Sequence, residues 1–95
     1  MTDEQKLFYE ELRKIQEFAV GFTMAQKDKY SSTEEMLEDI TYDMTYMFCE
    51  LIDGYRNNKI KYNLVNIKNY NLINDNIELH DWCEAFLRYK GAKNK

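Results

Sequence analysis

The chain has 95 residues, of which 44% are hydrophobic and 32% charged, and its formal net charge is −4. That length suits one domain, and this balance is typical of a folded protein rather than a disordered one. An acidic chain argues against direct binding to nucleic acid or to anionic membrane, since both need clustered Lys and Arg. We expect a single compact domain over residues 1–95, with 90–95 as a frayed tail.

Several features predict a cytoplasmic protein. No apolar run approaches the roughly 18 residues that a membrane-spanning helix needs. The first residues, Met1 to Glu4, are acidic where a signal peptide would be basic and then apolar. Cys49 and Cys83 fit the reduced thiols of a cytosolic chain. The absence of proline and the abundance of Lys, Asn, Ile and Tyr are typical of AT-rich codon usage, which suggests a bacterium or a phage.

A first amphipathic helix is predicted from Asp3 to about Lys27. Thr2 and Gln5 have the spacing of a capping box, which would fix its start. Charged residues cover one side of this segment, and apolar residues recur at helical spacing on the other. The apolar positions are Phe8, Leu12, Ile15, Ala19 and Phe22, with Leu7 and Phe18 beside them.

The last turns of this helix carry an unusual glycine. Gly21 costs about 1 kcal/mol relative to Ala inside a helix, which indicates either fraying or close packing on another backbone. A helix of some 25 residues is also longer than one side of a compact domain of this size needs. Exposure of Phe18 and Phe22 at its end could allow a second copy to pair there, so a homodimer is one expectation.

A second helix is predicted from Ser32 to Gly54. Ser32 and Glu35 have capping-box spacing, and Gly54 suits a left-handed helix end. The short connection favours antiparallel packing on the first helix. Its apolar positions are Met36, Leu37, Ile40, Met44, Met47, Phe48, Leu51 and Ile52.

The hydrophobic period then changes from that of a helix to that of a strand. Apolar and polar residues alternate over 60–64, and a second short run follows at 70–73. Lys68 and Asn69 can form a tight turn between them, because Asn tolerates positive φ. This pattern predicts a short β-hairpin that packs on the helices.

A third helix is predicted from about Asn76, with Asp75 and Glu78 as its capping box. The predicted fold is therefore α+β and predominantly helical, in the order α-α-β-β-α, with all elements around one core. The apolar stripe of the third helix would be Leu79, Trp82, Cys83, Phe86 and Leu87.

The strongest candidate for a contact surface lies on the second helix. Asp39, Asp43, Tyr46, Glu50 and Asp53 follow 4-3-4-3 spacing and so share one stripe of the helix. Like charges at i and i+4 repel, and a purely structural surface would more often mix signs. We interpret this stripe as a face for a basic partner protein, with the tyrosine as an aromatic anchor. The alternative interpretation is a solvated face that keeps the chain soluble.

A second candidate follows that helix. Arg56, Lys59 and Lys61 lie between Tyr55 and Tyr62, and such a segment could contact a phosphate or a nucleotide signal in a homo-oligomer. The same lysines could also protect an edge strand from unwanted pairing.

Catalytic motifs are missing from the sequence. It has no phosphate-binding glycine loop, no metal motif of known spacing and no nucleophile elbow. His80 and Cys83 are three residues apart and could form a Cys–His centre, but a surface ion pair beside a core cysteine explains them as well. We predict no catalytic residue, metal or cofactor. The compact, acidic character is similar in kind to small inhibitor, immunity and phage counter-defence proteins.

Overall fold

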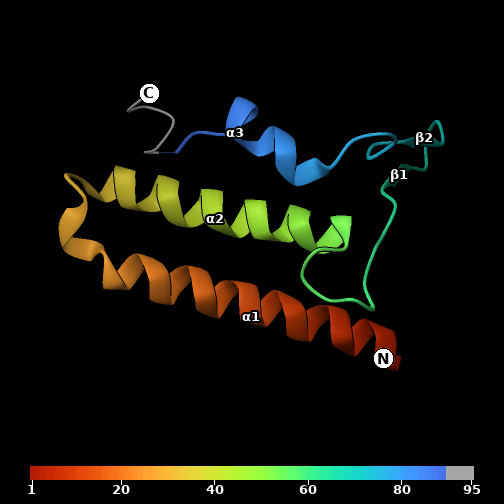
Figure 1. The fold of residues 1–95 in the computed structure, drawn as a ribbon, viewed down its shortest axis with the longest axis horizontal. Helices are drawn as coiled ribbons and strands as arrows, with labels where there is room; N and C mark the ends of the chain where they lie inside the picture. Colours follow the sequence, from red (N-terminus) through yellow and green to blue (C-terminus); the bar gives the residue numbers. More distant parts are fainter. Residues whose placement is uncertain (90–95) are drawn as a thin grey trace.

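The fold is known from a computed structural model, which describes residues 1–89; the predicted tail at 90–95 lies outside the described residues. Helices α1 (Asp3–Ala25) and α2 (Thr33–Asp53) run antiparallel, and the 3-10 turn η1 (Lys27–Lys29) joins them (Figure 1). The first helix therefore ends slightly earlier than predicted, because the chain tightens into this turn.

The second half of the chain is less regular. An extended segment leads from α2 to a two-stranded antiparallel sheet of β1 (Val65–Asn66) and β2 (Asn71–Leu72). The chain then returns along α2 through the 3-10 helix η2 (Leu79–Trp82) and the short helix α3 (Cys83–Phe86) (Figure 1). The predicted fold class and the predicted order of elements are confirmed.

The predicted helix ends are local features that the structure confirms. Thr2 Oγ1 accepts the Gln5 N–H at 3.1 Å, and Gln5 Oε1 accepts the Thr2 N–H at 2.8 Å. Ser32 Oγ accepts the Glu35 N–H at 3.2 Å, so α2 is capped as expected. Gly54 ends α2 with a φ of 92°, in the left-handed region that glycine adopts without strain.

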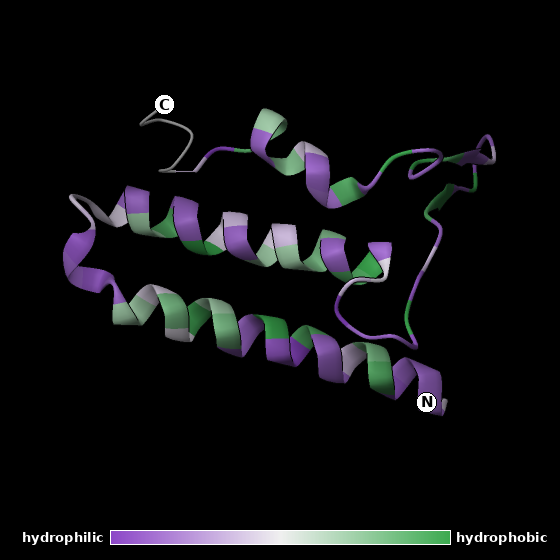
Figure 2. Ribbon diagram, in the orientation of Figure 1, coloured by the Kyte–Doolittle hydropathy of each residue, from purple (hydrophilic) through white to green (hydrophobic). Residues whose placement is uncertain are grey.

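The hydrophobic core lies between α1 and α2 (Figure 2). Each helix turns an apolar stripe toward the other, and the extended segment closes the core from one end. Because the core has few fully buried residues, each of them matters more than it would in a larger domain. The buried cluster is Ile15, Ala19, Met47, Leu51 and Ile60.

Several residues of the predicted apolar stripes are exposed. Phe18 and Phe22, near the end of α1, keep half of their surface in solvent. On the returning segment, Trp82 is half-exposed and Phe86 is 80% exposed. Only Cys83 of the predicted third stripe is buried, because the segment docks by a few contacts rather than along a full helical face.

The hairpin is shorter than predicted, and its turn differs in one detail. Val65 pairs with Leu72, and the turn between the strands is centred where it was expected. Positive φ is adopted by Tyr70, at 61°, rather than by an asparagine.

The first predicted strand, over 60–64, is extended but does not pair as a ladder. The Asn74 side chain takes the place of a partner strand: its Nδ2 donates to the Tyr62 carbonyl at 2.9 Å and its Oδ1 accepts the Leu64 N–H at 3.0 Å. The polar side chain satisfies backbone groups that a longer hairpin would have paired.

The predicted start of the third helix is wrong. Asn76 has a left-handed φ of 59°, and helical structure begins only at Leu79. Asp75 and Glu78 therefore do not form a capping box. Glu78 Oε1 instead accepts a hydrogen bond from the Tyr55 hydroxyl at 3.1 Å.

Candidate functional site

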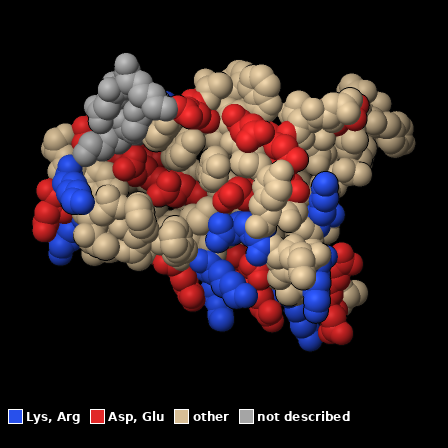
Figure 3. Space-filling view, viewed as in Figure 1, with Lys and Arg blue, Asp and Glu red and all other residues tan. Residues whose placement is uncertain are grey.

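The four predicted contact residues do lie along one side of α2. Asp39, Asp43, Tyr46 and Glu50 are all half-buried rather than fully exposed. In Figure 3, acidic side chains form a band over α2, whereas the basic ones gather mainly along α1. The stripe is thus present as a surface, and its role as a contact face stays a prediction.

The N-terminal half of the stripe concentrates negative charge. The Asp39 side chain forms a hydrogen bond with Tyr30. Burial raises the pKa of the Asp43 carboxyl, and the neighbouring Asp39 carboxylate raises it further. No Lys or Arg within residues 1–89 is among the groups that shift this pKa. Asp39 and Asp43, called the acidic pair below, are thus two half-buried carboxylates one helical turn apart.

The C-terminal half of the stripe is engaged within the molecule. Glu50 Oε1 lies 3.3 Å from Arg56 Nη1. The Tyr46 ring stacks on Tyr42 with centroids 6.1 Å apart and meets the edge of His80 at 5.5 Å. These contacts partly occupy the C-terminal half of the stripe, whereas the acidic pair concentrates its negative charge.

The predicted anion-binding residues lie among carboxylates. Arg56 forms an ion pair with Glu50, while Lys59 is exposed. Lys61 lines a cavity of about 550 Å³ together with acidic residues. Negative charge in the same cavity repels an anionic ligand, so the arrangement favours this hypothesis less than the acidic-face hypothesis. The acidic residues of that cavity are Asp53, Asp75, Glu78 and Asp81.

A buried carboxylate at the end of α2 holds the returning segment. Asp53 Oδ1 accepts the Leu79 N–H at 3.0 Å, and Asp53 Oδ2 accepts the His80 N–H at 3.0 Å. The same Oδ2 lies 2.6 Å from His80 Nδ1. Asp53 is only 4% exposed, so these three contacts replace the water that its carboxylate would otherwise bind. It caps η2 from a distant part of the chain.

His80 is enclosed by aromatic and acidic groups. The Tyr55 ring meets it edge-on at 4.8 Å, and His80 Nε2 lies 3.3 Å from Asp81 Oδ1. Burial lowers the pKa of His80, but the hydrogen bond to Asp53 and the charges of Asp81, Asp53 and Glu50 outweigh it. The pKa of His80 is therefore raised above 6.5.

This environment predicts that stability depends on pH. His80 binds its proton more tightly in the folded state, so its contribution is complete below a pH of about 6.5 and is lost as the pH rises through the folded-state pKa. We expect the free energy of unfolding to fall between about pH 6 and about pH 8, and His80→Gln to abolish that part of the fall. Urea unfolding of the original chain and of His80→Gln at both pH values measures this change in the free energy of unfolding. Since the chain has one histidine, an NMR titration midpoint at or below that of a free histidine would contradict the expectation.

The same cluster is where a metal ion could be considered. Asp53, Glu78 and His80 each offer one ligand atom, and these atoms lie within 4.8 Å of one another. Both oxygens of Asp53 already accept backbone N–H groups, however, and His80 Nδ1 faces Asp53. A metal would have to compete with those hydrogen bonds, so we interpret the cluster as structural.

The geometry also bears on the proposed Cys–His centre. Both ring nitrogens of His80 face carboxylates, and Cys83 Sγ contacts the Leu79 carbonyl at 3.8 Å. Cys49 and Cys83 are free thiols in mutual contact. Burial, with a smaller effect of Cys83, raises the pKa of Cys49 to about 12. Because its thiol stays protonated at neutral pH, Cys49 is a weak nucleophile.

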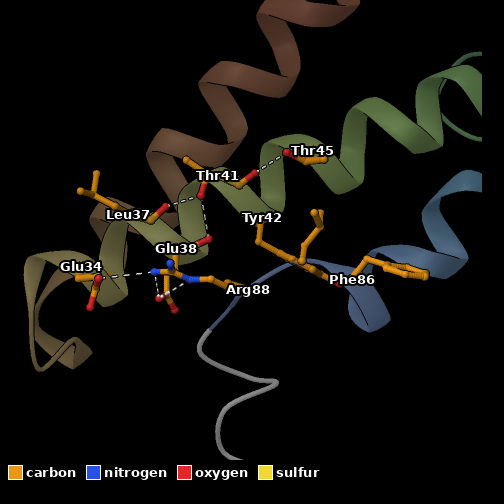
Figure 4. A pocket seen from close by; sticks show the side chains of 9 residues that line it. Glu34, Leu37, Glu38, Thr41, Tyr42, Thr45, Phe86 and Arg88 are labelled. Carbon is orange, nitrogen blue, oxygen red and sulfur yellow. Dashed lines mark hydrogen bonds and ion pairs between the residues drawn. The ribbon is translucent and has the colours of Figure 1, made fainter.

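A second long-range contact fastens the end of the described chain to α2. Arg88 Nη2 lies 2.6 Å from Glu38 Oε1 and 3.5 Å from Glu34 Oε2 (Figure 4). The Glu38 side chain is only 5% exposed, and the Tyr89 ring stacks on Tyr42 at 4.1 Å. These contacts border a cavity of about 550 Å³. The Phe86 ring lies at the edge of the cavity and points away from the Arg88 guanidinium (Figure 4).

Sequence reasoning did not identify Asp53, Glu38 or Arg88 as organising residues. Asp53 was placed only at the end of the acidic stripe, and Glu38 lies outside that stripe. A charged residue next to the apolar positions of α2 was the available signal, because such a residue must find a partner when buried.

Within residues 1–89, no helix combines the length and apolarity needed to cross a bilayer. No protein-family model, no curated protein and no solved structure matches this chain.

Proposed function

We propose that this chain is a small non-catalytic binding protein of the cytosol that occupies a basic surface of a partner protein. Its mode of action would be that of small inhibitors such as immunity or phage counter-defence proteins. The observation that carries this proposal is the acidic pair on α2, two half-buried carboxylates one helical turn apart whose burial and mutual repulsion raise the pKa of Asp43. A Lys or Arg side chain from a partner would relieve this repulsion.

Half-burial strengthens this argument. Charges that are partly removed from water interact more strongly with an incoming cation than fully solvated ones do. Tyr42 and Tyr46 lie on the same helix beside the acidic pair; Tyr89 and His80 cover part of their rings, and the remaining half-buried surface offers apolar area with polar tips to the same partner. The expected partner surface is therefore rich in Lys or Arg and has room for aromatic contact.

A lysine peptide of about ten residues is a suitable probe of the charge complementarity. We expect NMR shift changes at Asp39 and Asp43 on titration, with an affinity that falls as salt is added, because the attraction is electrostatic. The double variant Asp39→Asn and Asp43→Asn should weaken binding by at least about fivefold, the loss expected when close charge complementarity is removed. Asparagine keeps an acceptor for Tyr30, so the fold should persist.

The matched control is the double variant Glu10→Gln and Asp75→Asn, which removes the same net charge from exposed positions elsewhere. It should bind the peptide nearly as well as the original chain. Equal weakening in both double variants would mean that net charge alone attracts the peptide, and the acidic-face proposal would then be abandoned.

We also propose that two copies of the chain associate. Phe18 and Phe22 favour this, because both are large apolar side chains that keep half of their surface in solvent. Self-association is independent of the acidic pair, and either proposal can hold without the other.

A further inference from the structure

The last third of α1 is apolar on every side. From Phe18 to Ala25 the helix carries no charged residue, yet only Ala19 and Thr23 of this stretch are buried. Figure 2 shows the stretch in green and white, in contrast to the mixed colours earlier in α1. The exposed fractions are 55% for Phe18, 44% for Val20, 50% for Phe22 and 53% for Met24.

Such a surface is unusual for a helix in water. A helix that is apolar all round normally lies inside a protein, whereas a surface helix carries polar residues on its outer side. The four half-exposed side chains present roughly 400 Å² of apolar surface, which is within the range of the largest patch on a typical monomer and is often functional. The Phe18 and Phe22 rings stack with centroids 5.9 Å apart, so the patch is preformed.

Gly21 lies in the middle of this patch. A Cβ added at Gly21 would meet nothing within 4 Å, so packing inside the chain gives no reason for a glycine. Glycine destabilises the interior of a helix relative to alanine. A residue without a side chain does, however, let the backbone of another element approach closely.

We infer that this stretch of α1 is covered by the same stretch of a second copy, the two helices crossing antiparallel at Gly21. The inference rests on the proposed self-association and specifies its interface. A two-fold axis at the glycine brings the two backbones together where neither has a side chain. The aromatic pair of each copy then packs beside the crossing, against the apolar turns of the other.

Charge supports a second copy as the occupant. Lys14 lies seven residues before Gly21 on about the same side of α1, and Asp28 lies seven residues after it in the turn η1, beyond the end of the helix. In an antiparallel pair that crosses at Gly21, Lys14 of each copy comes level with Asp28 of the other. Lys14 contacts Glu11 of its own chain but keeps 68% of its side chain exposed. It can therefore reach Asp28 of the other copy as well as its own Glu11.

The area of the apolar patch sets the expected strength of the dimer. About 400 Å² of apolar surface per copy, with the flanking polar residues, gives a total near the low end of specific interfaces. We therefore expect a reversible dimer with a dissociation constant on the order of 10 µM or weaker, rather than a permanent one.

Sedimentation equilibrium of the full chain, from about 5 to 500 µM, measures this association around the expected constant. The mass should rise toward twice that of one chain for the original sequence. Phe22→Lys should weaken association by at least about tenfold, because it places a charge in the apolar interface. Ile67→Lys, at a position 81% exposed in the hairpin turn, is the matched control and should dimerise like the original chain.

Gly21→Ala gives a test that misfolding cannot mimic. Alanine should raise the melting temperature of the dilute monomer, since it favours the helix, and should weaken the dimer severalfold, since a methyl group separates the backbones. A dimer unchanged in Phe22→Lys, or strengthened in Gly21→Ala, would overturn this interface and leave self-association standing. A monomer at every concentration would overturn both.

Discussion

Replacing Asp53 with alanine is expected to lower the free energy of unfolding by about 3 kcal/mol, because it leaves buried hydrogen-bond donors without an acceptor. Three donors are affected: the N–H groups of Leu79 and His80 and the His80 ring. The loss would be concentrated where η2 meets α2, since Asp53 lies at the end of α2 and binds the start of η2. We therefore expect the segment from Leu79 onward to detach before α1 and α2 separate.

Urea unfolding followed by circular dichroism measures the total loss. Amide hydrogen exchange at Leu79 and His80 shows whether that segment is the part that opens. Asp53→Asn should cost less than Asp53→Ala, since the amide oxygen can still accept one of the N–H groups. Asp75→Ala is the control: its carboxylate is exposed and should cost less than about 0.5 kcal/mol. If Asp75→Ala proved the more damaging of the two alanine variants, the role given to Asp53 would be wrong.

The contrast between these two aspartates shows what sequence reasoning can and cannot reach. The caps at Thr2, Ser32 and Gly54 were predictable because each one involves residues within about one turn of the helix. Asp75 and Glu78 had the same local spacing, but the cap of the returning segment comes from Asp53. Spacing along the chain cannot reveal a partner that tertiary packing supplies.

The hairpin shows the same limit. Alternation over 60–64 correctly predicted extended structure, but an alternating pattern does not specify its partner. The side chain of Asn74 competes successfully for the backbone groups of Tyr62 and Leu64, and the paired strands form only beyond them. An asparagine that substitutes for a strand has no distinct signature in sequence.

The candidate contact face was predicted in part. The 4-3-4 spacing correctly placed Asp39, Asp43, Tyr46 and Glu50 on one side of α2, because helical geometry is local. The spacing could not show that Arg56 and His80 engage the last two of these residues, since both come from the chain beyond the helix. What distinguishes the acidic pair is therefore a property of the folded molecule.

The second large loss of stability is expected for a substitution in the hydrophobic core. Leu51→Ala is expected to lower the free energy of unfolding by about 3 kcal/mol, because it removes buried methyl groups and leaves a cavity between α1 and α2. Leu51 is fully buried, and few other residues of this small core are. A domain of this size has a stability toward the lower end of roughly 5–15 kcal/mol, so a substantial part would be lost.

Leu37→Ala is the matched control for this experiment, because it makes the same chemical change on the same helix at a position that is 54% exposed. Both substitutions gain the same helix propensity, so their difference in urea unfolding isolates burial. We expect the control to change stability by less than about 0.5 kcal/mol in the monomer. Equal losses at the two positions would mean that Leu37 is also covered in solution, and a small loss at Leu51 would mean that the two helices do not pack as described. Carried out at concentrations below those at which the chain associates, the same measurement thus separates an exposed apolar position of α2 from the core.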